Sequence, residues 1–378
     1  MTQTVLFNAL AARPGGGAMV WEALAAGGRG HGSDLKLIAL TSHGQVCSMI
    51  KEANPAIEVR ELAAGSGIRS FTQEQALIDE ALGPDPNRVV VSQNRMTRGS
   101  AGPQVVLHIN LSRYQPGSGA RGWKQRPAEL IRDRAAKAAL TGAAANIFES
   151  NFLLDAAIGR YPNLSINNPS VAHVGLADGW ALPVDAPVAD HDKRRGRLLA
   201  ITSPQPHKDN DTLVRVLADL NRAEPGSWTL AICSGREAAA FQPQLDLAES
   251  LGVRDSIELL GFLDRPGLAA ELDRTVAVVS ASKVESFCSV ALESMARGVP
   301  AVVTNLASMP ESVGPDGLLV GEGDVDGFVR TVQTLDRDPA AWADRSAEAR
   351  RWAATMTWDR FGLKVMNIVE DAAGTVGR

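Results

Sequence analysis

Residues 276–303 contain the pattern that most restricts how this chain can fold. An apolar, β-branched run at 276–279 is followed by a polar loop and by a helix-type segment at 288–297. Gly298 marks the end of that helix, because glycine is favoured just after a helix C-terminus. A second apolar run at 301–303 completes a strand–loop–helix–strand unit. Such units build parallel sheets that are covered by helices.

The loop before this helix is suited to an anionic ligand. Ligands of parallel sheets bind at the carboxyl ends of the strands, where the next helix offers unpaired N–H groups and a positive dipole end. Ser286 is the expected N-cap residue of the helix. With that cap, the backbone amides of Phe287, Cys288 and Ser289 would point at an anion. The pattern predicts a diphosphate at this helix end.

Two carboxylates accompany the predicted diphosphate site. Glu285 lies in the loop before the helix, and Glu293 lies about two turns inside it. One carboxylate can therefore hold one end of a ligand while the other holds a more distant, hydroxyl-rich part. The alternative interpretation is an unremarkable surface glutamate followed by a solvated helical glutamate.

Length and composition restrict the class of protein. A chain of 378 residues is expected to form two domains. A net charge of −5 and an aromatic fraction of 5% argue against a nucleic-acid partner. Cys47, Cys233 and Cys288 are far apart and odd in number, which indicates a reducing compartment. We found no signal-peptide pattern and no apolar run of about 20 residues. A cytoplasmic protein is therefore expected, at most peripheral to the inner face of the cell membrane.

Residues 282–300, SKVESFCSVALESMARGVP, resemble the donor-site signature of retaining glycosyltransferases of family 4. The resemblance rests on the spacing of the two glutamates, on Phe287 and on the Ala-Arg-Gly-Val-Pro run. It is dense over residues 198–365 and weaker in the first half of the chain. It implies an α/β protein with the GT-B fold, in which two Rossmann-like domains face a central cleft.

The resemblance also implies domain boundaries. We expect an N-terminal acceptor-binding domain over residues 1–180 and a nucleotide-sugar-binding domain over residues 198–355. Residues 181–197 are rich in Pro, Asp and Arg and are expected to be the linker. Residues 356–378 are expected to form a helix that packs back on the N-terminal domain.

The resemblance assigns roles to residues of the second domain. It implies that Glu285 contacts the hydroxyl groups of the donor sugar and that Glu293 contacts the ribose. The backbone around Leu260 would line the nucleobase pocket. Cys288 stands where the family usually has Gly, so its side chain could restrict the choice of sugar.

Lys208 precedes a predicted helix and could neutralise a diphosphate. The family usually carries a Gly-Arg pair five to six residues earlier, where this chain has Thr202 and Ser203. One of two expected phosphate-binding cations is therefore missing. Either Arg236, Lys283 or another cation replaces it, or donor affinity is reduced, or catalysis is lost.

The first half of the chain offers fewer candidates. Gly16 and Gly17 follow a predicted strand, and a tight turn and a ligand-binding loop are about equally consistent with them. The family's glycine-rich loop faces the donor phosphates, which favours binding. His108 ends a strand-type run, where the family often has a histidine near the donor sugar, although a lone histidine is more often structural. The basic segment 121–137 is interpreted as a solvated helix face or, alternatively, as a docking surface for an anionic membrane.

Together these features predict transfer of a sugar from a nucleotide-diphosphate-sugar to an acceptor hydroxyl, with retained configuration. The acceptor would be a glycan, a glycolipid or a small molecule, and the protein a monomer or homodimer. No cluster has metal-ligand spacing, so no metal and no other cofactor is expected. The alternatives are a catalytically degenerate GT-B protein, which binds a nucleotide-sugar or partners an active transferase, and a nucleotide-sugar epimerase. The predicted catalytic residues are Glu285, Lys208 and His108, and the predicted donor-binding residues are Gly16, Gly17, Ser203, Leu260, Phe287, Cys288, Ser289 and Glu293.

Overall fold

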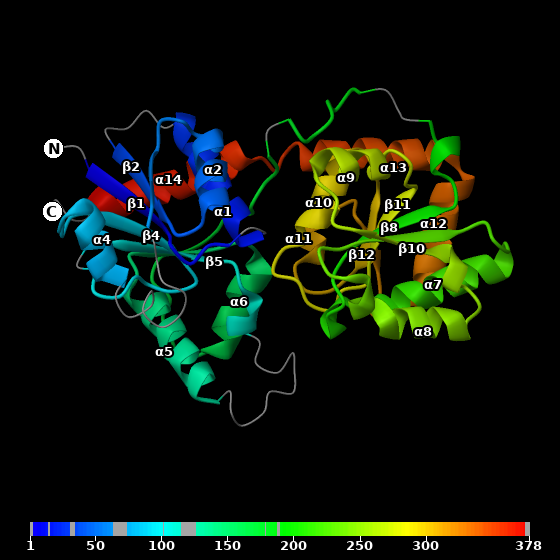
Figure 1. Ribbon diagram of the computed structural model, residues 1–378, viewed down its shortest axis with the longest axis horizontal. Helices are drawn as coiled ribbons and strands as arrows, with labels where there is room; N and C mark the ends of the chain where they lie inside the picture. The colour runs from blue at the N-terminus through cyan, green and yellow to red at the C-terminus, as the bar shows by residue number, and fades with distance from the viewer. Residues whose placement is uncertain are drawn as a thin grey trace. The chain divides into compact units, whose positions relative to one another are not determined.

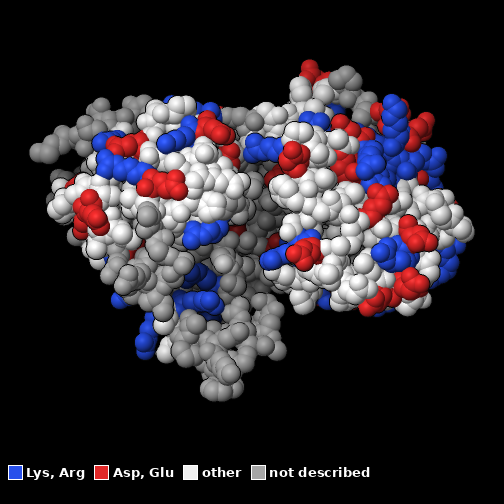
Figure 2. All heavy atoms as spheres, viewed as in Figure 1, with Lys and Arg blue, Asp and Glu red and all other residues white. Residues whose placement is uncertain are grey.

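The chain forms two compact units, each built on one parallel sheet (Figure 1). The computed structural model describes residues 3–13, 16–30, 35–62, 74–100, 102–114, 126–177, 179–186 and 190–374. Unit 1 comprises Met1–Gly175 and Met356–Arg378, and unit 2 comprises Leu176–Thr355. On the face shown in Figure 2, basic side chains lie among acidic ones.

Unit 1 contains a seven-stranded sheet in the order β3-β2-β1-β4-β5-β6-β7. Its central strands are continuous apolar runs, as expected for strands that are covered on both faces. The strands are β1 (Gln3–Ala9), β2 (Leu35–Thr41), β3 (Glu58–Glu61), β4 (Val89–Gln93), β5 (Gln104–His108), β6 (Ala145–Phe148) and β7 (Pro169–Val171). The helices are α1 (Gly16–Gly27), α2 (Gly44–Ala53), α4 (Glu74–Leu82), α5 (Arg126–Gly142), α6 (Asn151–Arg160) and α14 (Trp358–Gly374).

Unit 2 contains a six-stranded sheet in the order β10-β9-β8-β11-β12-β13. The strands are β8 (Arg197–Ile201), β9 (Thr229–Cys233), β10 (Ile257–Gly261), β11 (Ala277–Ser280), β12 (Ala301–Thr304) and β13 (Leu318–Val320). The helices are α7 (Asn210–Ala223), α8 (Gln242–Ser250), α9 (Arg265–Leu272), α10 (Ser289–Ala296), α11 (Met309–Val313), α12 (Val325–Arg337) and α13 (Pro339–Ala353). Large aromatic side chains, among them Trp228, Phe241, Phe328 and Trp342, fill the core.

Both sheets have the strand order of a dinucleotide-binding fold. Numbered within each unit, six strands run 3-2-1-4-5-6, so the chain direction across the sheet reverses between β1 and β4 and between β8 and β11. Ligands of open α/β sheets bind beyond the carboxyl ends of the strands at such switch points. The fold therefore selects two places at which to look for a site.

The last helix, α14, belongs to unit 1 although it follows unit 2 in the sequence. It packs on α1, and a Cβ added at Gly27 would lie 2.2 Å from the Cα of Gly362. The two glycines therefore allow the helix backbones to touch. The buried face of α14 includes Phe361, Val365 and Met366.

The segment that was expected to be a linker packs on unit 2. The amide of Leu182 donates to the Ala296 carbonyl, and the amide of Gly196 donates to Asp336. Arg194 is 2% exposed, donates to the Thr275 carbonyl and lies over the Trp342 ring at 5.1 Å. These anchors are polar groups, which explains why the segment lacks the apolar periodicity of a packed element.

Candidate functional site

The switch point of unit 2 brings Lys208 and Glu285 together. Strands β8 and β11 are paired, and each leads into a segment that bears one of these residues. The chain after β8 forms a short 3-10 helix, Pro206–Lys208. The amide of Lys283 donates to the His207 carbonyl at 2.8 Å, which joins the two segments. The Nζ of Lys208 lies 2.5 Å from Oε1 of Glu285.

This ion pair is partly open to solvent, since the side chains of Lys208 and Glu285 are 21% and 16% exposed. An ammonium in such a place can exchange its carboxylate for an incoming phosphate, and the freed carboxylate can then accept a sugar hydroxyl. The neighbouring His207 has a lowered pKa because of burial and, secondarily, the charge of Lys208. His207 is thereby kept neutral.

The start of α10 differs from the expectation. The helix begins at Ser289 and its N-cap is Cys288, so the predicted N-cap at Ser286 is wrong. The amide of Cys288 donates to Oγ of Ser312 at 2.9 Å, and the amide of Ser289 donates to the Phe287 carbonyl at 3.1 Å. The side chains of Phe287 and Cys288 are buried, and a buried amide needs a partner. These two amides therefore do not face an open anion site as the sequence predicted.

Glu293 is a mostly buried carboxyl group on α10. Burial raises the pKa of Glu293 to about 7, and the charge of Arg265 acts in the opposite direction. Within the described residues, its carboxylate has no hydrogen-bond or ion-pair partner. Near neutral pH the protonated carboxyl group can donate a hydrogen bond to a ligand hydroxyl, and the ionised carboxylate can accept one from it.

Two buried serines of the α11 region hold the Glu285 loop in place. The hydroxyl of Ser308 donates to the Glu285 carbonyl at 2.9 Å, and Ser312 accepts the Cys288 amide. Both serines are fully buried. No sequence pattern singled them out, because a structural serine hydroxyl leaves no periodic signal.

The turn in place of the family's Gly-Arg pair is held by Asn210. Its Nδ2 donates to the Ser203 carbonyl at 2.8 Å, and its Oδ1 accepts from the Thr202 hydroxyl at 3.0 Å. Of the candidate replacement cations, Lys283 lies 3.4 Å from Asp209 and 3.8 Å from Glu322. Its charge is therefore already compensated.

The predicted nucleobase segment lies at the end of β10. Leu260 sits at an irregularity in the β9–β10 register, and Gly261 has a φ of +68°. The Gly261 carbonyl accepts the Ser234 amide. The next residue, Phe262, belongs to the same predicted segment, and its side chain is 78% exposed.

The switch point of unit 1 carries a buried ion pair and a neutral contact. Arg95, which follows β4, lies 2.6 Å from Oε2 of the buried Glu74, and Nδ2 of Asn8 in β1 donates to Oε1 of Glu74 at 2.7 Å. Gly16 begins α1, and the carbonyl of Gly17 accepts a hydrogen bond from Nε2 of Gln93 at 2.8 Å, which joins the chain after β1 to the end of β4. Gly15, a third residue of the predicted glycine loop, lies outside the described residues. The sequence predicted that Gln93 lies at a strand end but did not predict its contact with Gly17.

His108, for which a catalytic role was predicted, is a buried residue of unit 1. It is 0% exposed, and its ring stacks on Phe148 with centroids 4.5 Å apart. Its Nε2 lies 2.9 Å from Oδ1 of Asn146, and its Nδ1 lies 2.6 Å from the Tyr114 hydroxyl. Burial lowers the pKa of His108 to about 4. A neutral imidazole with both nitrogens engaged is held firmly within unit 1.

Next to this network, Arg113 has buried Nε and Nη1 atoms that lack a hydrogen-bond partner within the described part of the chain. Burial is the main reason that its pKa is lowered, and the nearby cations Arg95 and Arg132 add to the effect. A cation in this state favours an anionic ligand.

Among the described residues, no group of three or more His, Cys, Asp or Glu side chains is arranged to hold a metal ion. No helix within the same residues combines the length and the apolar character that a bilayer-spanning segment needs.

Solved structures resemble the whole chain. Sucrose-phosphate synthase from Thermosynechococcus elongatus matches with a TM-score of 0.74 at 18% identity, covering 99% of this chain and 100% of that one. HepE from Anabaena, solved with UDP and glucose, matches with a TM-score of 0.69 at 17% identity and 99% coverage of both chains. The chain has the GT-B fold. The predicted fold class is thus confirmed.

The sequence comparisons match part of this chain. A family model described as glycosyl transferases group 1 matches residues 185–352. A D-inositol 3-phosphate glycosyltransferase from Salinispora arenicola is 30% identical over 192 residues, which are 48% of this chain and 43% of the relative. A glycogen synthase from Mycobacterium tuberculosis is 35% identical over 148 residues, 39% of this chain and 35% of the relative. The chain thus spans less than half the length of these relatives. Residues 185–352 are thus similar to glycosyl transferases group 1, whereas membership of family 4 stays a prediction.

Proposed function

We propose that this protein is a glycosyltransferase that moves a sugar from a nucleotide-diphosphate-sugar to an acceptor hydroxyl. The observation that carries the proposal is the contact between Lys208 and Glu285 at the switch point of unit 2. The group 1 family model covers the same unit, and the names of the relatives describe sugar transfer. The HepE structure, which contains UDP and glucose, supports a nucleotide-sugar donor.

In the proposed mechanism, Lys208 stabilises the charge that develops on the departing diphosphate. A preorganised cation at such a place acts on the transition state more than on the ground state. Glu285, once released from the lysine, accepts hydroxyl groups of the donor sugar, and Glu293 binds the ribose. The leaving phosphate takes the proton of the acceptor hydroxyl, the glycosidic bond to the diphosphate breaks, and the new bond forms with retained configuration. This route has no step that needs a metal.

The amides of Cys288 and Ser289 donate within the protein. The diphosphate contact in this proposal therefore depends chiefly on Lys208. The side chain of Cys288 remains a candidate for limiting which sugar fits, because it is buried beside the Glu285 loop.

Unit 1 is proposed to bind the acceptor. The unpartnered buried nitrogens of Arg113 favour an acceptor with an acidic group, such as a phosphate. On α5, Leu130 and Ile131 are 52% and 55% exposed next to basic residues. Exposed apolar and basic side chains together suit a membrane surface that carries a glycolipid acceptor.

A second candidate function is nucleotide-sugar binding without catalysis. The observation that favours it is Thr202 and Ser203 in place of the Gly-Arg pair, together with the compensated charge of Lys283. A single phosphate-binding lysine would then hold a nucleotide-sugar without stabilising the negative charge that develops on the diphosphate when it leaves the sugar.

The test is a screen of UDP, GDP and ADP, and of their glucose derivatives, by calorimetry and by release of free nucleotide. We expect one nucleotide to bind, its sugar derivative to turn over in the presence of an acceptor extract, and Lys208→Met to abolish both. Lys193→Met is the matched control, since Lys193 is 77% exposed in the same unit. Binding without turnover for every donor would establish the non-catalytic alternative, and absence of all binding would refute both.

A further inference from the structure

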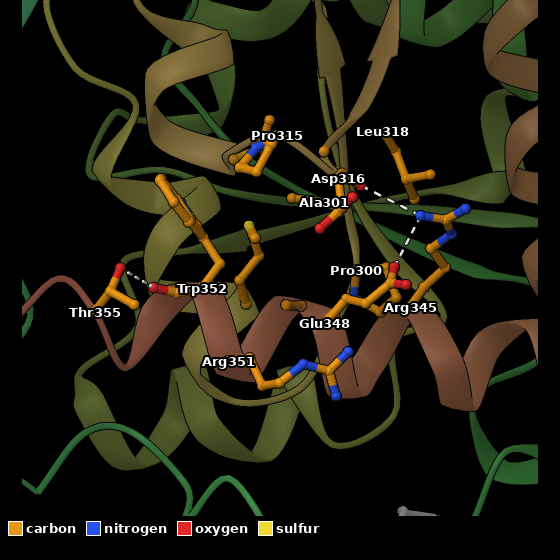
Figure 3. A pocket seen from close by; sticks show the side chains of 14 residues that line it. Pro300, Ala301, Pro315, Asp316, Leu318, Arg345, Glu348, Arg351, Trp352 and Thr355 are labelled. Atoms are coloured by element: carbon orange, nitrogen blue, oxygen red, sulfur yellow. Dashed lines mark hydrogen bonds and ion pairs between the residues drawn. The ribbon is translucent and has the colours of Figure 1, made fainter.

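A pocket lies in unit 2 at the opposite end of the strands from the Lys208–Glu285 pair. It has a volume of about 210 Å³ and is bounded by parts of α10, α13 and the segment after α11 (Figure 3). Ala301 and Leu318, the first residues of β12 and β13, lie in its wall. The pocket is therefore at the amino ends of the strands, whereas the proposed donor site is at their carboxyl ends. It is a separate site, and the proposed reaction does not use it.

The walls of this pocket combine an apolar surface with charges of both signs. Met295, Val313, Pro315 and Trp352 supply apolar surface. Of the charged residues, Arg345 donates to Glu348 at 2.8 Å and to the Asp316 carbonyl at 3.3 Å, so these charges are matched within the protein.

Two charged groups of the pocket form no ion pair or side-chain hydrogen bond with the described residues. The carboxylate of Asp316 and the guanidinium of Arg351 are exposed, and neither has a partner among the described residues. They lie on different elements, one before β13 and one on α13. A pocket with one free anion, one free cation and an apolar wall is matched by a small ligand that is itself both cationic and anionic.

The volume of the pocket limits the size of the ligand that can bind there. At about 30 Å³ per water, the space corresponds to about seven water molecules. It lies below the roughly 300–1,000 Å³ of pockets that hold drug-sized ligands. The ligand is therefore a compact one, of the size of a single amino acid.

Hydrogen bonds connect the pocket to the Glu285 loop. The Nε1 of Trp352, in the pocket wall, donates to the Ser312 carbonyl at 2.9 Å. The hydroxyl of Ser312 accepts the Cys288 amide at 2.9 Å, and Ser308 one turn earlier donates to the Glu285 carbonyl. A chain of direct contacts through α11 thus joins the pocket to the loop.

The packing around Trp352 makes this connection stiff. Gly314 ends α11 with a φ of +78°, and a Cβ there would lie 2.4 Å from the indole ring. The ring is therefore in close contact with the end of α11. In addition, α10 carries Met295 in the pocket and Ser289 at the Glu285 loop, about 9 Å apart along the helix.

We propose that this pocket binds a free α-amino acid with an apolar side chain, and that its occupancy changes nucleotide affinity at the donor site through α11. The ammonium group of the ligand pairs with Asp316, the carboxylate pairs with Arg351, and the side chain packs on Trp352 and Met295. The binding half stands on the pocket alone, whereas the coupling half rests on the proposed function.

The binding half is tested by titrating L-phenylalanine, phenylacetate and phenethylamine into the full-length protein, with ligand-observed NMR as the readout. We expect phenylalanine to bind about tenfold more tightly than either analogue, since each analogue loses one charge contact. Arg351→Gln should remove the preference over phenethylamine, and Asp316→Asn should remove the preference over phenylacetate. Arg215→Gln, a change at an exposed arginine of α7, is the control. Equal binding of the three compounds, no binding of any, or an unchanged preference in Arg351→Gln overturns the proposal.

The coupling half is tested by measuring the Kd values of UDP, GDP and ADP with and without saturating phenylalanine. We expect about a fivefold change for the nucleotide that binds, within the usual range of coupling between sites. Ser312→Ala should still bind phenylalanine but lose the change in nucleotide affinity. Phenylalanine binding that leaves nucleotide affinity unchanged overturns the coupling. A protein that binds phenylalanine but no nucleotide contradicts the proposed function instead, so the two failures are distinct.

Discussion

The two units of this protein share one strand order but differ in the chemistry at their switch points. In unit 2, the chains after β8 and β11 carry a lysine and a glutamate in a partly exposed ion pair. In unit 1, Gln93 at the end of β4 meets Gly17 through a neutral contact, and the neighbouring Arg95–Glu74 ion pair has a buried carboxylate that is 3% exposed. The same topology thus provides two candidate crevices, and the charge and exposure of a few side chains decide what each can do.

The units also differ in the exposure of their strand-end side chains. Lys208 and Glu285 are partly open to solvent and in contact with each other. His108, at the end of β5 in unit 1, is fully buried and has a pKa of about 4. Burial without an opposite charge favours the neutral form. Unit 2 therefore offers a partly exposed charged pair at its switch point, whereas His108 of unit 1 offers a buried neutral group that is held by hydrogen bonds.

The largest expected effect is on the ion pair of unit 2. Lys208→Met or Glu285→Gln should each lower kcat/KM by about 10²–10³-fold, which is the loss seen when one preorganised transition-state contact is removed. Steady-state nucleotide release measures it. Gln93→Met, the counterpart in unit 1, should cost far less. Comparable losses at the two switch points would remove the contrast between the units.

His108→Leu should reduce the free energy of unfolding by about 3 kcal/mol, because it leaves the hydroxyl of Tyr114 and Oδ1 of Asn146 without their His108 partner in a buried place. Urea denaturation measures the change. Turnover per folded molecule should stay within about twofold of wild type, far from the loss of a catalytic group. A stable His108→Leu protein with lost turnover would restore the histidine to the active site.

The third prediction concerns the pH dependence of stability. The pKa of Glu293 rises from 4.5 to about 7 on folding, so its ionisation opposes folding increasingly as pH rises through that window and fully above it. Glu293→Gln should therefore be more stable than wild type by about 2 kcal/mol at pH 8, after allowance for partial exposure. The gain should vanish at pH 4. Urea denaturation at both pH values tests this, and equal gains at both would contradict it.

The smallest expected effect is at the serines that hold the Glu285 loop. Ser308→Ala should cost about 1 kcal/mol of stability through its lost hydrogen bond to the Glu285 carbonyl. It should also weaken nucleotide binding more than a change at an unrelated hydroxyl does. Thr334→Ala, which removes a solvent-exposed hydroxyl on α12, is the matched control. Identical nucleotide affinity in the two variants would show that the loop holds its shape without the serine.

Much of the fold could be predicted from residue pattern because strands and helices follow local rules. The run at 276–303 was predicted as strand, loop, helix and strand, and the structure has β11, α10 and β12 there. Lys208 and Glu285, 77 residues apart, were predicted to serve one donor site from the rule that ligands bind at strand ends together with the family resemblance, whereas their direct ion pair was not predicted. Patterns of this kind are readable because apolar periodicity and strand-end polarity are properties of neighbouring residues.

The errors came from contacts between distant residues. The N-cap of α10 moved from Ser286 to Cys288 because Ser312, on another element, takes the Cys288 amide. Asn146 and Tyr114 close around the ring of His108 and bury it. Ser312 lies 24 residues from Cys288 and Asn146 lies 38 residues from His108, so neither is identifiable from the residues that flank the site in sequence.

By itself, the sequence determined the α/β class, the strand–loop–helix unit and the residue types available to a diphosphate, because these depend on local periodicity and spacing. Only the tertiary structure decided which polar groups remain free. It satisfied the amides of Cys288 and Ser289 and both nitrogens of His108, while it left Glu293, Asp316 and Arg351 without partners within the described residues. The physical reason is that hydrogen-bond satisfaction and desolvation depend on which elements pack together, which no local pattern encodes.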